Sequence, residues 1–166
     1  MIFSDRYKLV NDIWMPGPEY KFEYSDGDET ENYILTTLQQ STDISIGSVE
    51  LYSKIKDWPS LYHLSPKRAD LLRPLAEYFK QGKILEIGSG CGAITRFIGE
   101  QGADVLALEG SPRRARITRE RCRDLSNVQV LADNFQSFEH TEQFDCITLI
   151  GVLEYSNRFI QADNPP

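Results

Sequence analysis

Four short apolar runs divide the second half of this chain, at residues 84–87, 103–108, 128–132 and 144–150. Runs of this length that carry few charges predict strands buried on both faces, as in a parallel sheet. The segments that separate the first three runs have apolar residues at helical spacing. Because strands alternate with helices, we predict an α/β fold in which a parallel sheet has right-handed crossovers.

The first half of the chain has a weaker periodicity. Residues 14–18 contain two prolines and a glycine, which predict an irregular segment. Residues 20–24 alternate aromatic and charged side chains, which predicts a half-exposed strand. Helical spacing predicts helices over residues 28–40 and 48–56, and the second should end before Pro59.

Another helix is predicted to begin at residue 65. Ser65 is a natural N-cap, and Pro66 suits the first helical position. Pro74 lacks an amide donor and should kink or split this helix, which Gly82 then ends. The side chains predicted to face a core are Leu71, Leu72, Leu75 and Phe79.

The stretch from Lys83 to Thr95 carries the most specific functional signal. Its sequence, KILEIGSGCGAIT, predicts a strand, a turn with glycines at alternate positions (Gly88, Gly90 and Gly92) and the start of a helix. Strand, glycine-rich turn and helix make a βα unit of the kind that binds nucleotides. Glycines allow a tight turn and let the backbone approach a ligand without a Cβ in the way.

This stretch resembles the first motif of the class I S-adenosylmethionine-dependent methyltransferases. The dinucleotide fingerprint G-x-G-x-x-G/A also fits, as Gly88, Gly90 and Ala93. Glu86 opposes that alternative, because an acid at the end of the strand is unfavourable beside a diphosphate. It suits a cofactor that presents an ammonium and a sulfonium group, so the predicted cofactor is S-adenosylmethionine.

The resemblance implies a Rossmann-like class I methyltransferase fold, with strands in the order 3-2-1-4-5-7-6. The apolar runs account for strands 3-2-1-4, so we expect the C-terminal part of the domain to be missing. We also expect the fragment alone to be inactive and to self-associate through its fourth strand. Residues 65–166 are then a partial cofactor-binding domain. Residues 1–64 are a mainly helical extension, with a strand or hairpin, that can cover the pocket.

Acidic residues come at or just after the end of every predicted strand of this sheet. They are Glu86, Glu109, Asp133 and Glu154. Ligands of open α/β sheets bind beyond the carboxyl ends of the strands. The sequence therefore predicts a ligand site along this edge.

The resemblance also implies roles at this edge. Glu109 is placed to accept both ribose hydroxyls, and Asp133 lies near the adenine amino group, with Asn134 and Phe135 beside it. Gly151 begins a run that lines the cofactor pocket in many small-molecule methyltransferases. The alternative for Glu109 is a solvated acid before a turn, and for Asp133 an N-cap, which is compatible with the ligand role.

The segment Tyr62-His-Leu-Ser-Pro66 resembles one that precedes the first motif in methyltransferases associated with glycosyltransferases and polysaccharide synthesis. It implies Tyr62 at the cofactor pocket, a sugar or other small hydroxyl as acceptor, and fusion or association with a glycosyltransferase. His63 is the candidate general base for that hydroxyl, although a packed histidine explains it as well. Arg68 either pairs with the cofactor carboxylate or is simply solvated.

Composition and charge limit the kinds of partner, membrane association and metal site that we expect. The net charge of −7 argues against nucleic acid and anionic membranes, and the arginines after Ser111 are interpreted as a solvated helix face. No apolar run approaches the roughly 20 residues of a membrane span. The three cysteines fit neither a disulfide framework nor a zinc site. A reducing cytoplasm is the expected location, and no metal is expected.

We therefore predict an enzyme that transfers a methyl group from S-adenosylmethionine to a small-molecule or sugar hydroxyl. Two other functions stay open at this point. One is an NAD-dependent oxidoreductase, which Glu86 opposes. The other is a non-catalytic module that binds the cofactor or a partner protein.

Overall fold

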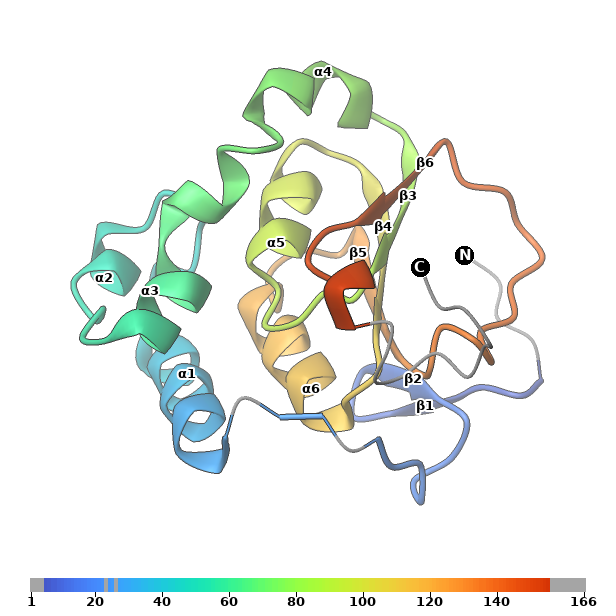
Figure 1. Ribbon diagram of the computed structural model, residues 1–166. Coiled ribbons are helices and arrows are strands. Elements are labelled where there is room, and N and C mark those ends of the chain that lie inside the picture. The colour runs from blue at the N-terminus through green and yellow to red at the C-terminus, as the bar shows by residue number, and fades with distance from the viewer. Residues whose placement is uncertain (1–4, 23, 26, 156–166) are drawn as a thin grey trace.

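A single mixed sheet organises the computed structural model, which describes residues 5–22, 24–25 and 27–155. Four parallel strands lie side by side in the predicted order 3-2-1-4, and an N-terminal hairpin extends the sheet beyond the third of them (Figure 1). Parallel strands joined through helices make this a Rossmann-like α/β fold. In spatial order, the strands are β1 (Lys8–Val10), β2 (Ile13–Met15), β5 (Val128–Ala132), β4 (Asp104–Glu109), β3 (Lys83–Ile87) and β6 (Cys146–Leu149).

Helices α5 (Ala93–Glu100) and α6 (Pro112–Arg121) cover one face of the sheet (Figure 1). Alternate strand residues point to this face, and Ile84, Val105 and Val130 are almost completely buried there. Burial of this apolar area stabilises the sheet by about 25 cal/mol per Å². The layer positions the glycine turn, because that turn connects β3 directly to α5.

The opposite face is covered by the N-terminal segment and by the loop between β5 and β6. Tyr7, Leu85 and Leu106 form a buried cluster there, against which Phe138 packs. At the end of the sheet order, β6 exposes Ile147 and Leu149, which are 53% and 40% accessible. The fourth predicted strand is thus an edge strand within the described residues.

The N-terminal hairpin corrects two predictions. The segment predicted as irregular contributes β2, which pairs in parallel with β5 at Trp14 and Leu131. Asn11 and Asp12 have φ angles of 50° and 60°, the conformation of a two-residue hairpin turn, which these residue types favour. The described part of residues 20–24, predicted as a strand, is irregular.

Three helices lie between the hairpin and Ser65: α1 (Asp28–Gln40), α2 (Val49–Tyr52) and α3 (Trp58–Leu64). The first matches its prediction, whereas α2 is shorter than the predicted residues 48–56. Helix α2 does end before Pro59, as predicted. Pro59 itself, however, lies in the first turn of α3. Asp57 accepts a hydrogen bond from the Ser60 amide in a capping box, and proline is tolerated in a first helical turn.

The helix predicted after Ser65 is broken into pieces. Ser65 caps it as predicted, and Pro74 lies where it splits. The pieces are two 3₁₀ segments, η1 (Pro66–Ala69) and η2 (Arg73–Leu75), and a short helix, α4 (Ala76–Phe79). Leu72 and Phe79 are buried as predicted, but Leu71 and Leu75 are 64% and 44% exposed. The prediction for those two is wrong, because 3₁₀ segments have three residues per turn and rotate side chains off the helical face.

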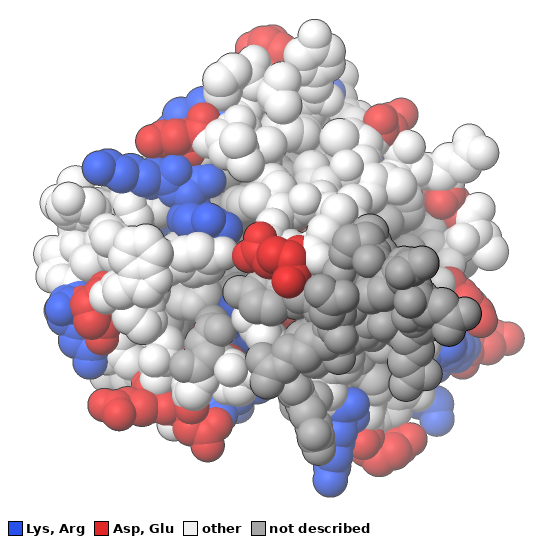
Figure 2. All heavy atoms as spheres, viewed as in Figure 1, with Lys and Arg blue, Asp and Glu red and all other residues white. Residues whose placement is uncertain are grey.

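The arginines of α6 are not a uniformly solvated face. Arg121 is completely buried and donates to the backbone oxygen of His63 at 2.9 Å. Arg113 pairs with Asp28 and Glu31 of α1. These contacts attach the N-terminal helices to α6. On the face that Figure 2 shows, basic and acidic side chains are interspersed among the described residues.

Candidate functional site

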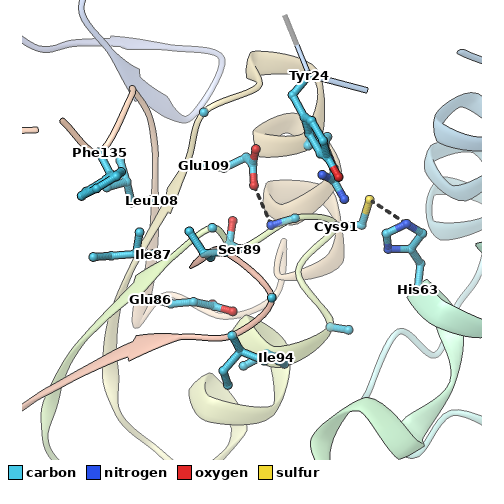
Figure 3. A pocket seen from close by; sticks show the side chains of 18 of the residues that line it. Tyr24, His63, Glu86, Ile87, Ser89, Cys91, Ile94, Leu108, Glu109 and Phe135 are labelled. Atoms are coloured by element: carbon cyan, nitrogen blue, oxygen red, sulfur yellow. Dashed lines mark hydrogen bonds between the residues drawn. The ribbon is translucent and has the colours of Figure 1, made fainter. Parts of the chain in front are cut away.

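A cavity of about 480 Å³ lies where the central strands end at their carboxyl edge. Eleven of the twelve residues predicted for the site line it. They are Tyr62, His63, Arg68, Glu86, Gly88, Gly90, Glu109, Asp133, Asn134, Phe135 and Gly151. Gly92 does not. Figure 3 shows Ser89 of the glycine turn between Glu109 and Glu86, with Phe135 and Leu108 close to each other at the left.

The glycine turn needs its glycines for two different reasons. A Cβ on Gly88 would lie 2.5 Å from Val152, so this position lets the segment after β6 approach the turn. A Cβ on Gly92 would lie 2.9 Å from the Cα of Thr118, so this glycine lets α5 pack against α6. Gly92 therefore supports the turn and does not face the cavity.

Glu109 is fixed by the turn that it supports. One of its carboxylate oxygens accepts the Gly90 amide at 2.7 Å, and the other accepts the Ser111 amide at 3.0 Å. Burial raises the pKa of Glu109, while the nearby Arg114 lowers it. A carboxylate that accepts two amides keeps further lone pairs for hydroxyl donors. Its position at the cavity fits the ribose role implied by the sequence.

Glu86 is a buried acid inside the same cavity. Its side chain accepts a hydrogen bond from the Thr95 hydroxyl at 2.5 Å. Burial raises the pKa of Glu86 to about 7, the Thr95 hydrogen bond opposes that shift, and the charge of Glu109 adds to it. A cation in the cavity would favour the ionised form. The site is therefore suited to a positively charged group.

Glu86 should make stability fall as pH rises. Its pKa is raised from 4.5 to about 7 in the folded chain. The contribution of Glu86 to the free energy of unfolding is therefore greatest below pH 4.5 and is lost as the pH rises through 7. We expect Glu86→Gln to be more stable than the parent protein at pH 8 by roughly 1–3 kcal/mol, measured by urea unfolding.

The matched control for that measurement is Glu29→Gln, which changes an exposed acid in the first turn of α1. Its stability difference from the parent should not depend on pH. Equal stabilities of Glu86→Gln and the parent at both pH 5 and pH 8 would contradict the prediction.

Asp133 is held from the opposite end of the chain. Its carboxylate accepts hydrogen bonds from Tyr7 Oη at 2.9 Å and from Arg6 Nη2 at 3.0 Å. It also accepts the Asn134 amide at 2.8 Å. The side chain is 1% exposed, and Phe135 lies next to it along the cavity wall. The sequence identified this acid, but not its partners.

Residues of α3 and η1 line another part of the cavity. The Arg68 guanidinium lies 4.0 Å from the centre of the Tyr62 ring, which orients a cation toward the cavity. His63 is buried, with Nε2 3.9 Å from the sulfur of Cys91 (Figure 3). Trp58 also lines this side.

Phe22, Tyr24 and Arg114 are among the residues of the cavity wall that sequence reasoning missed. Phe22 lies against Gly110, and a Cβ added to this glycine would lie 2.8 Å from the Phe22 ring. Tyr24 lies above the turn (Figure 3), with the Arg114 guanidinium 4.9 Å from its ring centre. The aromatic alternation of residues 20–24 was a visible signal, but it was interpreted as a strand. Arg114 was grouped with the solvated arginines.

Together these groups can hold an elongated, nucleoside-like ligand. Acids lie along the strand ends, and apolar side chains such as Phe135 and Leu108 offer a surface for a planar base. Arg68 offers a cation for a carboxylate at the other side. No helix of the described residues is long and apolar enough to cross a membrane.

Comparison with known proteins agrees with this geometry. Residues 85–163 match the family model described as a methyltransferase domain. The ribosomal RNA small subunit methyltransferase A of Streptococcus equi subsp. zooepidemicus is 43% identical over 56 residues, which cover 34% of this chain and 19% of that protein. The demethylmenaquinone methyltransferase of Tropheryma whipplei is 32% identical over 71 residues, covering 43% and 30%. This chain thus matches less than a third of either relative's length.

Solved structures show partial likeness. Coclaurine N-methyltransferase bound to N-methylheliamine and SAH superposes with a TM-score of 0.46 at 20% identity, covering 75% of this chain and 42% of that one. The tRNA (m1A58) methyltransferase TrmI from Aquifex aeolicus superposes with a TM-score of 0.45 at 18% identity, covering 57% and 41%.

These relatives correct one prediction and support another. The exclusion of nucleic acid is wrong, because ribosomal RNA methyltransferases are among the relatives. Net charge is a sum over the whole chain, so it does not show how charge is distributed over any one surface. The match covers the glycine turn and the strands that follow it. Residues 85–163, which include that turn, are thus similar to a methyltransferase domain.

Proposed function

We propose that this protein binds S-adenosylmethionine and supports methyl transfer from its sulfonium to a nucleophile. The observation that carries the proposal is the pairing of Glu109 with the Gly90 amide at 2.7 Å. This hydrogen bond joins the end of β4 to the glycine turn. As a result, a carboxylate that can accept hydroxyl donors and the backbone of the glycine turn face the same cavity. Glu86 adds a second acid, which a dinucleotide diphosphate would not tolerate nearby.

Each part of the ligand has a partner in this proposal. Glu109 accepts the ribose hydroxyls, while Asp133 accepts the base amino group and Phe135 packs on the ring. Ionised Glu86 favours the positive end of the ligand, and Arg68 pairs with its carboxylate. The apolar walls and the cover exclude water from the reacting groups.

The bound cofactor would supply an electrophilic methyl group, and the chain would supply position and desolvation. We propose a sugar or other small hydroxyl as the acceptor. His63 is the candidate base, since its imidazole lines the cavity and histidine is the side chain that most often serves as a general base. A nucleic-acid base is the second candidate acceptor, favoured by the ribosomal RNA methyltransferases among the relatives.

We further propose that residues 1–64 act with residues 65–166 as one unit, with α3 covering the cavity. Arg121 supports this arrangement, because it donates to the backbone of His63 at the end of α3. The cysteines of the described residues are free thiols, which fits the predicted cytoplasmic location.

Calorimetry with S-adenosylhomocysteine and NAD tests the cofactor. We expect S-adenosylhomocysteine to bind the 166-residue chain and NAD to bind at least about 100-fold more weakly, since burying an unpaired anion beside Glu86 is costly. Glu29→Gln serves as a control that leaves both affinities unchanged. Tight binding of NAD together with no binding of S-adenosylhomocysteine would support the oxidoreductase alternative.

A further inference from the structure

Two residues just before the N-terminal hairpin contact one acid of the cavity. Arg6 and Tyr7 immediately precede β1, and both donate to Asp133 at the end of β5, more than 120 residues later in the chain. Tyr7 is 5% exposed, and its ring packs with Leu106 and other leucines of the sheet. This contact is therefore built into the core and is more than a surface ion pair.

Tyr7 holds two elements at once. Its hydroxyl donates to Asp133 at 2.9 Å and accepts the backbone amide of Glu139 at 3.1 Å. Burial raises the pKa of Tyr7 to about 12, so the hydroxyl keeps its proton at neutral pH. The loop that follows β5 carries Asn134 and Phe135, both of which line the cavity. One hydroxyl thus fixes the acid and the loop beside it.

The contacts leave part of the carboxylate for a ligand. Oδ2 of Asp133 accepts from both Tyr7 and Arg6, at 2.9 and 3.0 Å. Oδ1 accepts the Asn134 amide at 2.8 Å, and its contact with Arg6 is longer, at 3.3 Å. Because each carboxylate oxygen has two lone pairs, a ligand donor at Oδ1 would replace the longer contact with Arg6, which keeps its shorter bond to Oδ2.

We propose that Arg6 and Tyr7 are positioning residues that make Asp133 a fixed acceptor and thereby select a 6-amino purine over a 6-oxo purine. The inference rests on the proposed cofactor. A carboxylate that pairs with a guanidinium and a phenol accepts hydrogen bonds and does not donate them. An exocyclic amino group donates to it, whereas an oxo group at the same position is an acceptor and is repelled. Without the two donors, the carboxylate loses this fixed orientation.

The test compares two ligands of the parent chain and its variants. S-adenosylhomocysteine carries the amino group, and S-inosylhomocysteine carries the oxo group at the same position. We expect the parent to prefer the first by at least about tenfold, as expected for one hydrogen bond to a charged group. Tyr7→Phe keeps the packed ring and removes only the hydroxyl. It should weaken the amino ligand about tenfold and change the oxo ligand less than about twofold.

Arg6→Gln is the second variant, because the Arg6 side chain is 34% exposed and its loss removes little packing. It should reduce the preference in the same direction. Lys8→Gln, at an exposed residue of β1, is the matched control and should leave both affinities unchanged.

Each outcome decides the matter. An unchanged preference in both variants, with both ligands weakened equally, would show a structural role only and overturn the inference. A parent chain that binds S-adenosylhomocysteine without preference would overturn it too, while the proposed function would stand. If the parent binds neither ligand, the proposed function itself is wrong, and the inference fails with it.

Discussion

Replacing Gly92 by alanine should lower the free energy of unfolding by about 2–5 kcal/mol. Two effects add: a residue with a side chain at φ +78° is strained, which costs about 1–2 kcal/mol, and an overpacked contact costs typically about 1–3 kcal/mol. The new Cβ would lie 2.9 Å from the Cα of Thr118. Since that neighbour is backbone, α5 and α6 must move apart. Urea unfolding measures the loss.

Two other glycines separate the causes. Gly102 has φ +88° with nothing within 4 Å of a new Cβ, so Gly102→Ala should cost only the strain. Gly47 has open space and no positive φ, so Gly47→Ala should be nearly neutral. If Gly92→Ala is no less stable than Gly102→Ala, the close approach of the two helices does not require this glycine.

Replacing Glu109 by alanine should weaken binding of S-adenosylhomocysteine by about 100-fold or more. Loss of a hydrogen bond to a charged acceptor alone costs about 1.5–3 kcal/mol, or roughly ten- to hundred-fold in affinity. The structure adds a second cost, because the amides of Gly90 and Ser111 lose their acceptor. The glycine turn should therefore lose its shape as well as its ribose partner. Calorimetry measures the affinity.

The control is Asp104→Ala, which removes an exposed acid at the start of the same strand. It should bind as the parent does. Glu109→Gln keeps one acceptor oxygen and should give an intermediate loss. A folded Glu109→Ala protein that binds within threefold of the parent would remove the central support for the proposed site.

The parallel sheet was predictable because its signal is local. The four apolar runs correspond to β3, β4, β5 and β6, and the glycines and the Ser111-Pro112 cap mark the turns and helix starts between them. The acids of the site were predictable for the same reason. The carboxyl ends of parallel strands must lie at one edge, so residues that end strands become neighbours.

The N-terminal half was predicted less well, because its elements are short and depend on their partners. β2 has three residues and exists only as an addition to β5. Its Asn-Asp turn was a usable signal that the two nearby prolines obscured. The segment after Ser65 has helical spacing in sequence, yet Pro74 and the packing of Leu72 divide it into 3₁₀ pieces.

By itself, the sequence determined the four parallel strands, the glycine turn and the acids that end the strands, since each follows from residues close together in the chain. The spatial order of the strands was implied only by the family resemblance. Only the tertiary structure decided what surrounds those acids. Tyr7 reaches Asp133, Phe22 reaches Gly110, and Tyr24 lies beside Arg114. These pairs lie far apart in the sequence. Hydrophobic periodicity assigns a face to each residue, but the partner on that face is fixed only when the whole sheet and its cover assemble.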